Sequence, residues 1–287
     1  MKYRVGSVPY LNAKPLVRMF EELGDESPVE VVFAVPSKLP LMLERGEVQA
    51  IMVSSIEALR TPGRRIAQGV CIGTQKDVLS VRIFSKVPPR KIETLALDQS
   101  SMTSNALARI ILKERYDVAP EVNPEPPSLT DMLANHDACV LIGDNGMREQ
   151  GDGLHILDLG LEWHRLKNLP FVWAVWLGNE GLTPELSKHL VSAELWGRAN
   201  IDRVLADAPG ETGIPYALCE RYFHKIMHYH LDERELHGLK EFGRELHKFG
   251  LVDPVHFPAL IAADFSKELE FAKAHGANWA INHNQLT

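Results

Sequence analysis

The chain has 287 residues, of which 45% are hydrophobic and 24% are charged, and its formal net charge is −7 at pH 7. This length and composition allow a core larger than that of one typical domain, so two lobes are expected. The acidic balance, without any run of Lys and Arg, argues against a general binder of nucleic acid or anionic membranes, because both need a basic surface. A small-molecule partner is therefore favoured, and the oligomeric state is left open.

Cysteine usage and targeting signals indicate the compartment. Cys71, Cys139 and Cys219 are scattered and lack CxxC spacing, which predicts neither a disulfide framework nor a structural zinc site. No basic segment followed by an apolar one precedes the first strand, and no apolar run approaches the roughly 18 residues needed to cross a bilayer. The sequence predicts a reduced, cytoplasmic protein that is not exported.

Strand-like and helical segments alternate through the first part of the chain. Strands are predicted at "YRVGSV", "VEVVFAV", "VQAIMV" and "VLSVRIF", and helices at "KPLVRMFEELG" and "SKLPLMLERGE". This alternation is typical of βαβ units with a mostly parallel sheet. The prolines and charges of "SKVPPRKIET" then predict a linker.

A second α/β set follows this linker. It comprises the strand "TLALD", a helix from about Thr103 to Arg115, the strand "ACVLIG", the short segment "LHILDLG" and the apolar run "LPFVWAVWLG". The chain then turns helical, and Asp232 with Glu235 predicts a capping box at the start of one late helix. We interpret the late helices as mainly structural.

The stretch "VGSVPYLNAKPL", residues 5–16, places an amide where a strand passes into a helix. Pro9 ends strand pairing, so Asn12 lies at a junction of the kind where open α/β sheets present ligand-facing groups. Asn12 can contact a ligand there or simply cap the helix, and the stretch alone favours the cap.

A hydroxyl-rich turn follows the strand "TLALD". Ser100, Ser101, Thr103 and Ser104 cluster around the start of a helix. Free backbone N–H groups and the positive end of the helix dipole can hold a carboxylate or phosphate there. Ordinary capping explains one hydroxyl well but four poorly, so both interpretations stand.

Two further residues are candidates. Asp144, after the strand in "DACVLIGDNG", can orient a substrate hydroxyl, accept a proton or cap the next helix. Ser80 interrupts an apolar run and either bonds to the backbone or, beside a cleft, donates to a ligand.

Other patterns carry less weight. His224 and His228 have a metal-binding spacing but no HExxH motif, so no metal site is predicted. Trp173 and Trp176 are interpreted as core residues. No GxGxxG, P-loop or GxSxG motif is present, which argues against dinucleotide, NTPase and α/β-hydrolase functions.

Five segments in this order and spacing, "VPYLNAKPL", "LDQSSMTSNAL", "DACVLIGD", "LDLGLEW" and "LPFVWAVW", resemble the MqnA family, the chorismate dehydratases of the futalosine pathway of menaquinone biosynthesis. The resemblance covers about residues 3–178. It implies an α/β, two-lobed fold like that of type II periplasmic binding proteins, with a mainly helical C-terminal part. It also implies a lyase that converts chorismate to 3-[(1-carboxyvinyl)oxy]benzoate by loss of water, with no cofactor and no metal.

The resemblance carries roles onto individual residues. It implies catalytic roles for Asn12 and Ser80 and substrate-binding roles for Ser101, Thr103, Ser104 and Asp144. The family often has Arg where Met102 stands, and Thr-Gly where Lys167 and Asn168 stand.

We expect residues 1–88 and 178–287 to form lobe 1, residues 89–177 to form lobe 2, and the ligand cleft to lie between them. The chain would cross near 87–93 and near 171–178, a double hinge compatible with closure. Two alternatives remain: a non-catalytic binding or sensor protein for a small carboxylate, which would normally carry an export signal, and a related later enzyme of the same pathway.

Overall fold

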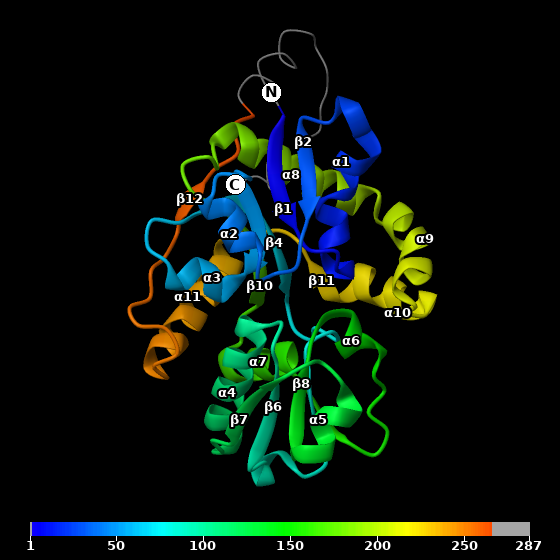
Figure 1. Ribbon diagram of the computed structural model, residues 1–287, viewed down its shortest axis with the longest axis vertical. Helices are drawn as coiled ribbons and strands as arrows, with labels where there is room; N and C mark the ends of the chain where they lie inside the picture. The colour runs from blue at the N-terminus through cyan, green and yellow to red at the C-terminus, as the bar shows by residue number, and fades with distance from the viewer. Residues whose placement is uncertain (1, 266–287) are drawn as a thin grey trace.

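Two separate β-sheets organise the chain, and each forms the centre of one lobe (Figure 1). The computed structural model describes residues 2–265. The first sheet has the strand order β11-β4-β10-β3-β1-β2, with β12 beside β4, and the second has the order β7-β6-β8-β5-β9. The predicted α/β, two-lobed fold class is confirmed. In the described part of the chain, no helix has the length and apolar character needed to span a membrane.

The first lobe combines segments from both ends of the described chain. Its strands are β1 (Tyr3–Ser7), β2 (Val29–Phe33), β3 (Ala50–Ser54), β4 (Arg65–Thr74), β10 (Phe171–Gly178), β11 (Met227–His228) and β12 (Ala259–Ile261). Its helices are the 3-10 helices η1 (Leu11–Leu16) and η2 (Gly24–Glu26), the α-helices α1 (Arg18–Leu23), α2 (Leu39–Glu44), α3 (Ser55–Arg60), α8 (Pro184–Ala199), α9 (Ile201–Thr212), α10 (Tyr216–Arg221) and α11 (Glu233–Lys248), and the π-helix η4 (Tyr222–Ile226).

The second lobe is continuous in sequence. Its strands are β5 (Arg82–Ser85), β6 (Thr94–Asp98), β7 (Glu121–Glu125), β8 (Ala138–Leu141) and β9 (His155–Asp158). Its helices are η3 (Pro89–Lys91), α4 (Met102–Tyr116), α5 (Leu129–Asn135), α6 (Gly143–Arg148) and α7 (Leu159–Lys167).

Each sheet mixes parallel and antiparallel pairs. In the first sheet β1 pairs parallel with β2 and β3, whereas β10 is antiparallel to β3 and β4. In the second sheet β6 pairs parallel with β7 and β8, whereas β5 is antiparallel to β8 and β9. β5 and β10 enter their sheets directly from the opposite lobe, so no crossover helix within that sheet makes them parallel. The two-residue strand β11 is also antiparallel to β4. The predicted parallel character therefore holds for the pairs of β1 with β2 and β3, of β12 with β4, and of β6 with β7 and β8.

The strand pairings correct the expected lobe boundaries. β5 lies in the second sheet and β10 in the first, so boundaries at 88/89 and 177/178 assign both strands to the wrong lobe. The chain crosses between sheets at residues 75–81 and 168–170. The proline-rich segment that suggested a linker instead forms a turn and η3 inside the second lobe, and neither of the actual crossings contains two adjacent prolines.

Helix α4 follows from local signals. Ser101 caps it by accepting a hydrogen bond from Ser104 N at 3.3 Å, and Leu107, Ile110 and Ile111 are fully buried at helical spacing. The helix ends at Asp117, which adopts a left-handed conformation with φ 57°. The predicted helix from Thr103 to Arg115 is confirmed to within one residue at each end.

Aromatic side chains pack at the second crossing. Trp163 of α7 meets Phe171 of β10 at 5.3 Å between ring centroids, and Phe171 meets Phe242 of α11 at 4.9 Å, both in edge-on geometry. Trp163 also donates from Nε1 to the carbonyl of Pro170, 3.1 Å away. These contacts fix the returning chain against both lobes.

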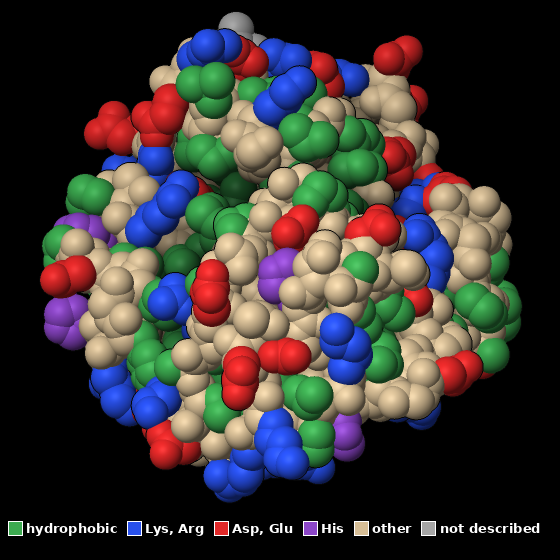
Figure 2. All heavy atoms as spheres, turned by 60° about the horizontal axis from the view of Figure 1, so that its bottom comes forward, with side chains coloured by type: hydrophobic (Ala, Val, Ile, Leu, Met, Phe, Trp, Pro, Cys, Tyr) green, Lys and Arg blue, Asp and Glu red, His purple; other side chains and the backbone are tan. Residues whose placement is uncertain are grey.

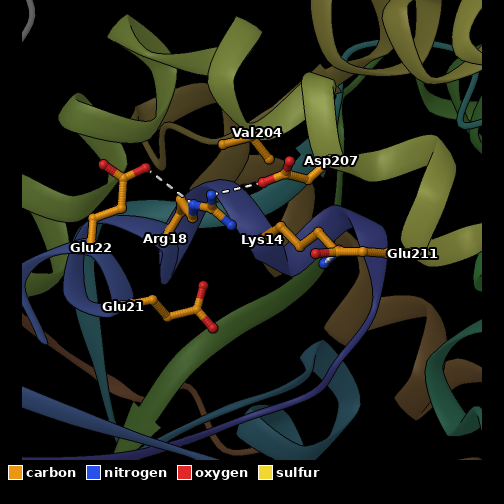
Figure 3. Close-up of a pocket in the computed structure, with 7 residues that line it drawn as sticks. All are labelled: Lys14, Arg18, Glu21, Glu22, Val204, Asp207 and Glu211. Atoms are coloured by element: carbon orange, nitrogen blue, oxygen red, sulfur yellow. Dashed lines mark hydrogen bonds and ion pairs between the residues drawn. The ribbon is translucent and has the colours of Figure 1, made fainter.

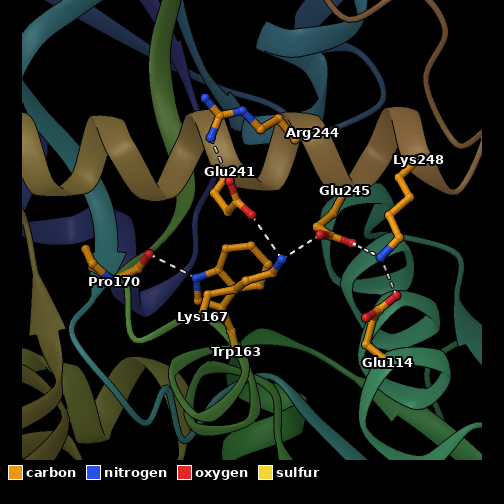
Figure 4. Close-up of polar contacts among 8 residues, drawn as sticks. All are labelled: Glu114, Trp163, Lys167, Pro170, Glu241, Arg244, Glu245 and Lys248. Carbon is orange, nitrogen blue, oxygen red and sulfur yellow. Dashed lines mark hydrogen bonds and ion pairs between the residues drawn. The ribbon is translucent and has the colours of Figure 1, made fainter.

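Ion pairs join α11 of the first lobe to two helices of the second (Figure 4). Lys167 of α7 lies 3.0 Å from Glu241 and 2.5 Å from Glu245, and Lys248 lies 2.6 Å from Glu114 of α4. Helix α11 thereby bridges the two lobes on the side where the second crossing runs.

Candidate functional site

A cavity of about 870 Å³ lies between the lobes. Five of the six predicted site residues line it: Asn12, Ser80, Ser101, Thr103 and Ser104. A cavity of this size is typical of small-molecule sites. On the face drawn in Figure 2, acidic and basic side chains are interspersed.

Asn12 lies inside η1 and does not cap it. The N-cap position belongs to Tyr10, which makes no capping bond with its side chain. The Oδ1 atom of Asn12 is buried and has no hydrogen-bond partner among residues 2–265. Because buried polar atoms are normally paired, this oxygen is available to a ligand in the cavity, and the capping interpretation is wrong.

Ser80 lies in the first crossing, not in a strand. The segment 78–84 was predicted as strand, but β5 begins only at Arg82. Leu79 has φ 64°, which is uncommon for a residue other than glycine and is typical of functional turns. The carboxylate of Asp158 holds this turn by accepting bonds from Val78 N at 3.0 Å and Leu79 N at 2.7 Å. The turn brings Ser80 to the cavity.

The hydroxyls at the start of α4 have different partners. Ser101 caps the helix, and the Ser100 hydroxyl donates to the aspartate that ends β6 at 2.5 Å. The Thr103 hydroxyl accepts a bond from Ile56 N of α3 in the other lobe at 3.0 Å. Because a hydroxyl that accepts one bond still has a proton to donate, Thr103 can join the lobes and contact a ligand at the same time.

Asp144 is the one predicted site residue that is not among those lining the cavity. It belongs to α6, and its Oδ1 accepts a bond from Leu11 N of η1 at 3.4 Å. Burial raises the pKa of Asp144, while the Leu11 bond and the charges of Arg148 and Lys14 partly offset that rise. Asp144 therefore contacts the backbone beside Asn12, across the lobe boundary.

Three aromatic residues that were not predicted as site residues line the cavity: Tyr10, Trp173 and Tyr222. Trp173 borders it, and its Nε1 donates to Thr74 Oγ1 at 3.1 Å, whereas Trp176 is fully buried as expected. Tyr222 borders it from η4, so the late helices are not only structural. Tyr10 and Trp173 stand in the segments "VPYLNAKPL" and "LPFVWAVW", whereas Tyr222 stands in no local motif that could have identified it.

Charge in the cavity is nearly balanced. Glu44, Glu57 and Arg60 are the charged residues that line it in the described part of the chain. Arg60 Nη2 lies 2.6 Å from the buried carboxylate of Glu57, and Nη1 lies 3.4 Å from the sulfur of Met102 at the start of α4. Glu44 pairs with Arg64. Arg60 is thus the cationic side chain that, among the described residues, lines the cavity and contacts the start of α4.

A second, smaller cavity of about 300 Å³ lies between η1, α1 and α9 (Figure 3). Arg18 pairs there with Glu22 at 3.1 Å and Asp207 at 2.7 Å, and Lys14 pairs with Glu211. Since both cations already have protein partners, this cavity offers an anion little. The Lys14–Glu211 pair attaches α9 to η1, which carries Asn12, and the Arg18–Asp207 pair attaches α9 to α1.

Comparisons with known proteins identify the family and the fold. A family model described as menaquinone biosynthesis matches residues 3–248. The chorismate dehydratase of Thermus thermophilus is 28% identical over 264 residues, covering 85% of this chain and 95% of that protein. The chorismate dehydratase of Campylobacter jejuni is 30% identical over 174 residues, covering 59% of this chain and 64% of that protein.

A solved structure shows the same architecture. The alkanesulfonate-binding protein SsuA of Xanthomonas axonopodis superimposes with a TM-score of 0.65 at 14% identity, over 91% of this chain and 98% of that one. The predicted fold, like that of periplasmic binding proteins, is confirmed. With the family model matching most of its length, the chain belongs to the menaquinone-biosynthesis family.

Proposed function

We propose that the chain is a chorismate dehydratase, a hydro-lyase that converts chorismate to 3-[(1-carboxyvinyl)oxy]benzoate and water in the futalosine pathway. The observation that carries the proposal is the cavity between the lobes, in which Asn12 and Ser80 meet the hydroxyl-rich turn of α4. Relatives described as chorismate dehydratases support it. The three free, buried cysteines suit the cytoplasmic location that we also propose.

The reaction removes the C3 hydrogen and the C4 hydroxyl of chorismate as water and leaves an aromatic ring. The site mainly has to orient the substrate and ease loss of the C3 proton. The ring carboxylate is conjugated with C3 and takes up negative charge as that proton leaves. Hydrogen-bond donors such as Ser80 and Thr103 would stabilise this charge.

Substrate binding has to hold two carboxylates on a protein of net charge −7. The N–H groups and hydroxyls at the start of α4 suit one of them, because Ser101, Thr103 and Ser104 line the cavity there. Arg60, beside the same turn, suits the other. Its pairing with Glu57 keeps the guanidinium in place until substrate arrives.

The proton acceptor in this proposal is the enolpyruvyl carboxylate of the substrate itself, held within reach by Asn12. Two protein carboxylates compete for the role. Glu57 is paired with Arg60, and Asp144 is bonded to Leu11 N and is not among the cavity-lining residues. An intramolecular base in a fixed conformer can offset weak basicity through high effective molarity.

The experiment is to incubate the purified protein with chorismate and follow the product by chromatography and mass. Deuterium at C3 should slow the chemical step, and Asp144→Asn and Glu57→Gln should each keep partial activity. If either substitution abolishes turnover while substrate still binds and the fold survives, a protein carboxylate is the base. Chorismate that is bound but unchanged would instead favour a binding or sensor protein.

A further inference from the structure

Tyr222 connects the C-terminal helices to the cavity. It is the first residue of the π-helix η4, which interrupts the path from α10 to β11. Single π-helical turns are rare, and those that are found often lie at functional sites. Tyr222 is 1% exposed, yet it borders the cavity. Its side chain therefore approaches the cavity from within the protein.

A small hydrophobic cluster fixes Tyr222 relative to both proposed catalytic residues. Tyr222 belongs to the same cluster as Leu11, which precedes Asn12, and Leu79, which precedes Ser80, packs against that cluster. The phenol oxygen lies 2.9 Å from Ser80 Oγ. Tyr222 thus meets two segments that are separated by almost 70 residues of sequence at the point where both reach the cavity.

The donors and acceptors around the phenol can be assigned. Burial raises the pKa of the Tyr222 phenol above its usual value, so the phenol keeps its proton. The Asn12 side chain also interacts with the phenol, and because its Oδ1 has no partner among residues 2–265, we assign its amide nitrogen to the side that faces the phenol oxygen. Because the phenol remains protonated, its own proton needs an acceptor, and an amide nitrogen cannot accept. Ser80 Oγ is the acceptor in reach among the described contacts.

We propose that Tyr222 is a positioning residue for the dehydration, donating its hydroxyl proton to Ser80 Oγ and so turning the Ser80 proton toward the substrate. In the same arrangement Asn12 gives its nitrogen to Tyr222, which leaves its Oδ1, the oxygen without a partner among residues 2–265, to face the ligand. The kinetic part of this inference rests on the proposed function. The hydrogen-bond order, meaning which of Asn12, Tyr222 and Ser80 donates to which in the free protein, does not rest on that function.

The kinetic test compares Tyr222→Phe with Tyr229→Phe. Tyr229 is a matched control, because it is also buried and its hydroxyl has no partner in the described structure. We expect Tyr222→Phe to lower kcat roughly 10- to 100-fold with little change in KM, since orientation of a donor is lost while the packing remains. Tyr229→Phe should stay within about twofold of wild type. An unchanged kcat in Tyr222→Phe would overturn the proposal.

A double-mutant cycle separates positioning from packing. In a Ser80→Ala background the hydrogen bond from Tyr222 to Ser80 is already lost. Tyr222→Phe should therefore lower kcat by less than about a further threefold. Equal effects in both backgrounds would show that Tyr222 acts independently of Ser80. If Tyr222→Phe does not fold, 3-fluorotyrosine at position 222, a stronger donor, replaces it. If 3-fluorotyrosine changes kcat when Ser80 is present but not in the Ser80→Ala background, Tyr222 acts through its hydrogen bond to Ser80. An unchanged kcat, or equal changes in both backgrounds, contradicts the proposal.

A measurement without substrate keeps this inference apart from the proposed function. The side-chain NH2 resonances of Asn12 can be assigned through their loss in Asn12→Asp. They should shift in ligand-free Tyr222→Phe and stay in place in Tyr229→Phe. Unshifted resonances in Tyr222→Phe would refute the hydrogen-bond order, whereas wild-type protein that leaves chorismate unchanged would refute only the proposed function.

Discussion

Replacing Arg60 with glutamine tests how the cavity holds a dianionic substrate. The Arg60 side chain is 44% exposed, so solvent screens its attraction for a carboxylate. A charge-assisted hydrogen bond from such a group contributes about 1.5–2 kcal/mol. That energy corresponds to roughly a 10- to 30-fold increase in KM for chorismate.

The partner of Arg60 sharpens the experiment. Arg60→Gln leaves the buried Glu57 carboxylate unpaired beside the ligand, which adds repulsion and should bring the increase in KM to the upper end of that range. The double variant with Glu57→Gln removes this repulsion and should recover about threefold. Glu57→Gln alone frees the guanidinium and should leave KM near wild type.

The assay is product formation at low and at high salt, with thermal melting to check the fold. Arg45→Gln is the control, because Arg45 has a 63% exposed side chain and only a long 3.8 Å contact with Glu47. The increase in KM for Arg60→Gln should shrink as salt rises. A wild-type KM in a well-folded Arg60→Gln protein would refute the reasoning and place both carboxylates elsewhere.

Other substitutions probe the remaining parts of the site and the fold. Asn12→Asp puts a negative charge beside an anionic ligand and should cost at least about 2 kcal/mol of transition-state stabilisation. The loss would be measured as a lower kcat/KM, and near-normal turnover would contradict it. Thr103→Val combined with Ser104→Ala should raise KM, and unaltered kinetics would exclude the turn as a carboxylate site. Burial raises the pKa of Glu235 to about 7, so the folded state binds a proton that the unfolded state lacks between about pH 4.5 and 7. The free energy of unfolding should therefore fall as pH rises through that interval, and urea unfolding of Glu235→Gln should show a smaller fall.

Local signals predicted the elements that local contacts determine. The helix after Ser101 and the cap at Asp232 were predicted almost to the residue, because a capping side chain and its N–H partners are close in sequence. Asp232 accepts bonds from the N–H groups of Arg234 and Glu235, as a capping residue should. These features needed no knowledge of the rest of the fold.

The features that could not be predicted depend on contacts between residues that are far apart in the sequence. Ser80 and Tyr222 are 142 residues apart, and only the packing of the C-terminal helices brings them together. β5 and β10 have ordinary strand compositions, and their sequences do not indicate which of the two sheets each strand joins. The prolines of 88–89 resembled a linker because a turn within a lobe and a turn between lobes have the same local chemistry. Asp144 matched its motif yet faces the η1 backbone.

The position of β10 has a consequence for how the protein is made. β10 joins β3 to β4 in the first sheet, so that sheet stays in two parts until residue 178 has left the ribosome. Residues 82–167 form the second lobe without interruption and are synthesised before then. The second lobe can therefore fold as a nascent chain before the sheet of the first lobe is complete. A translation product that stops before residue 171 would present a folded second lobe attached to a β4 that lacks its strand partner β10.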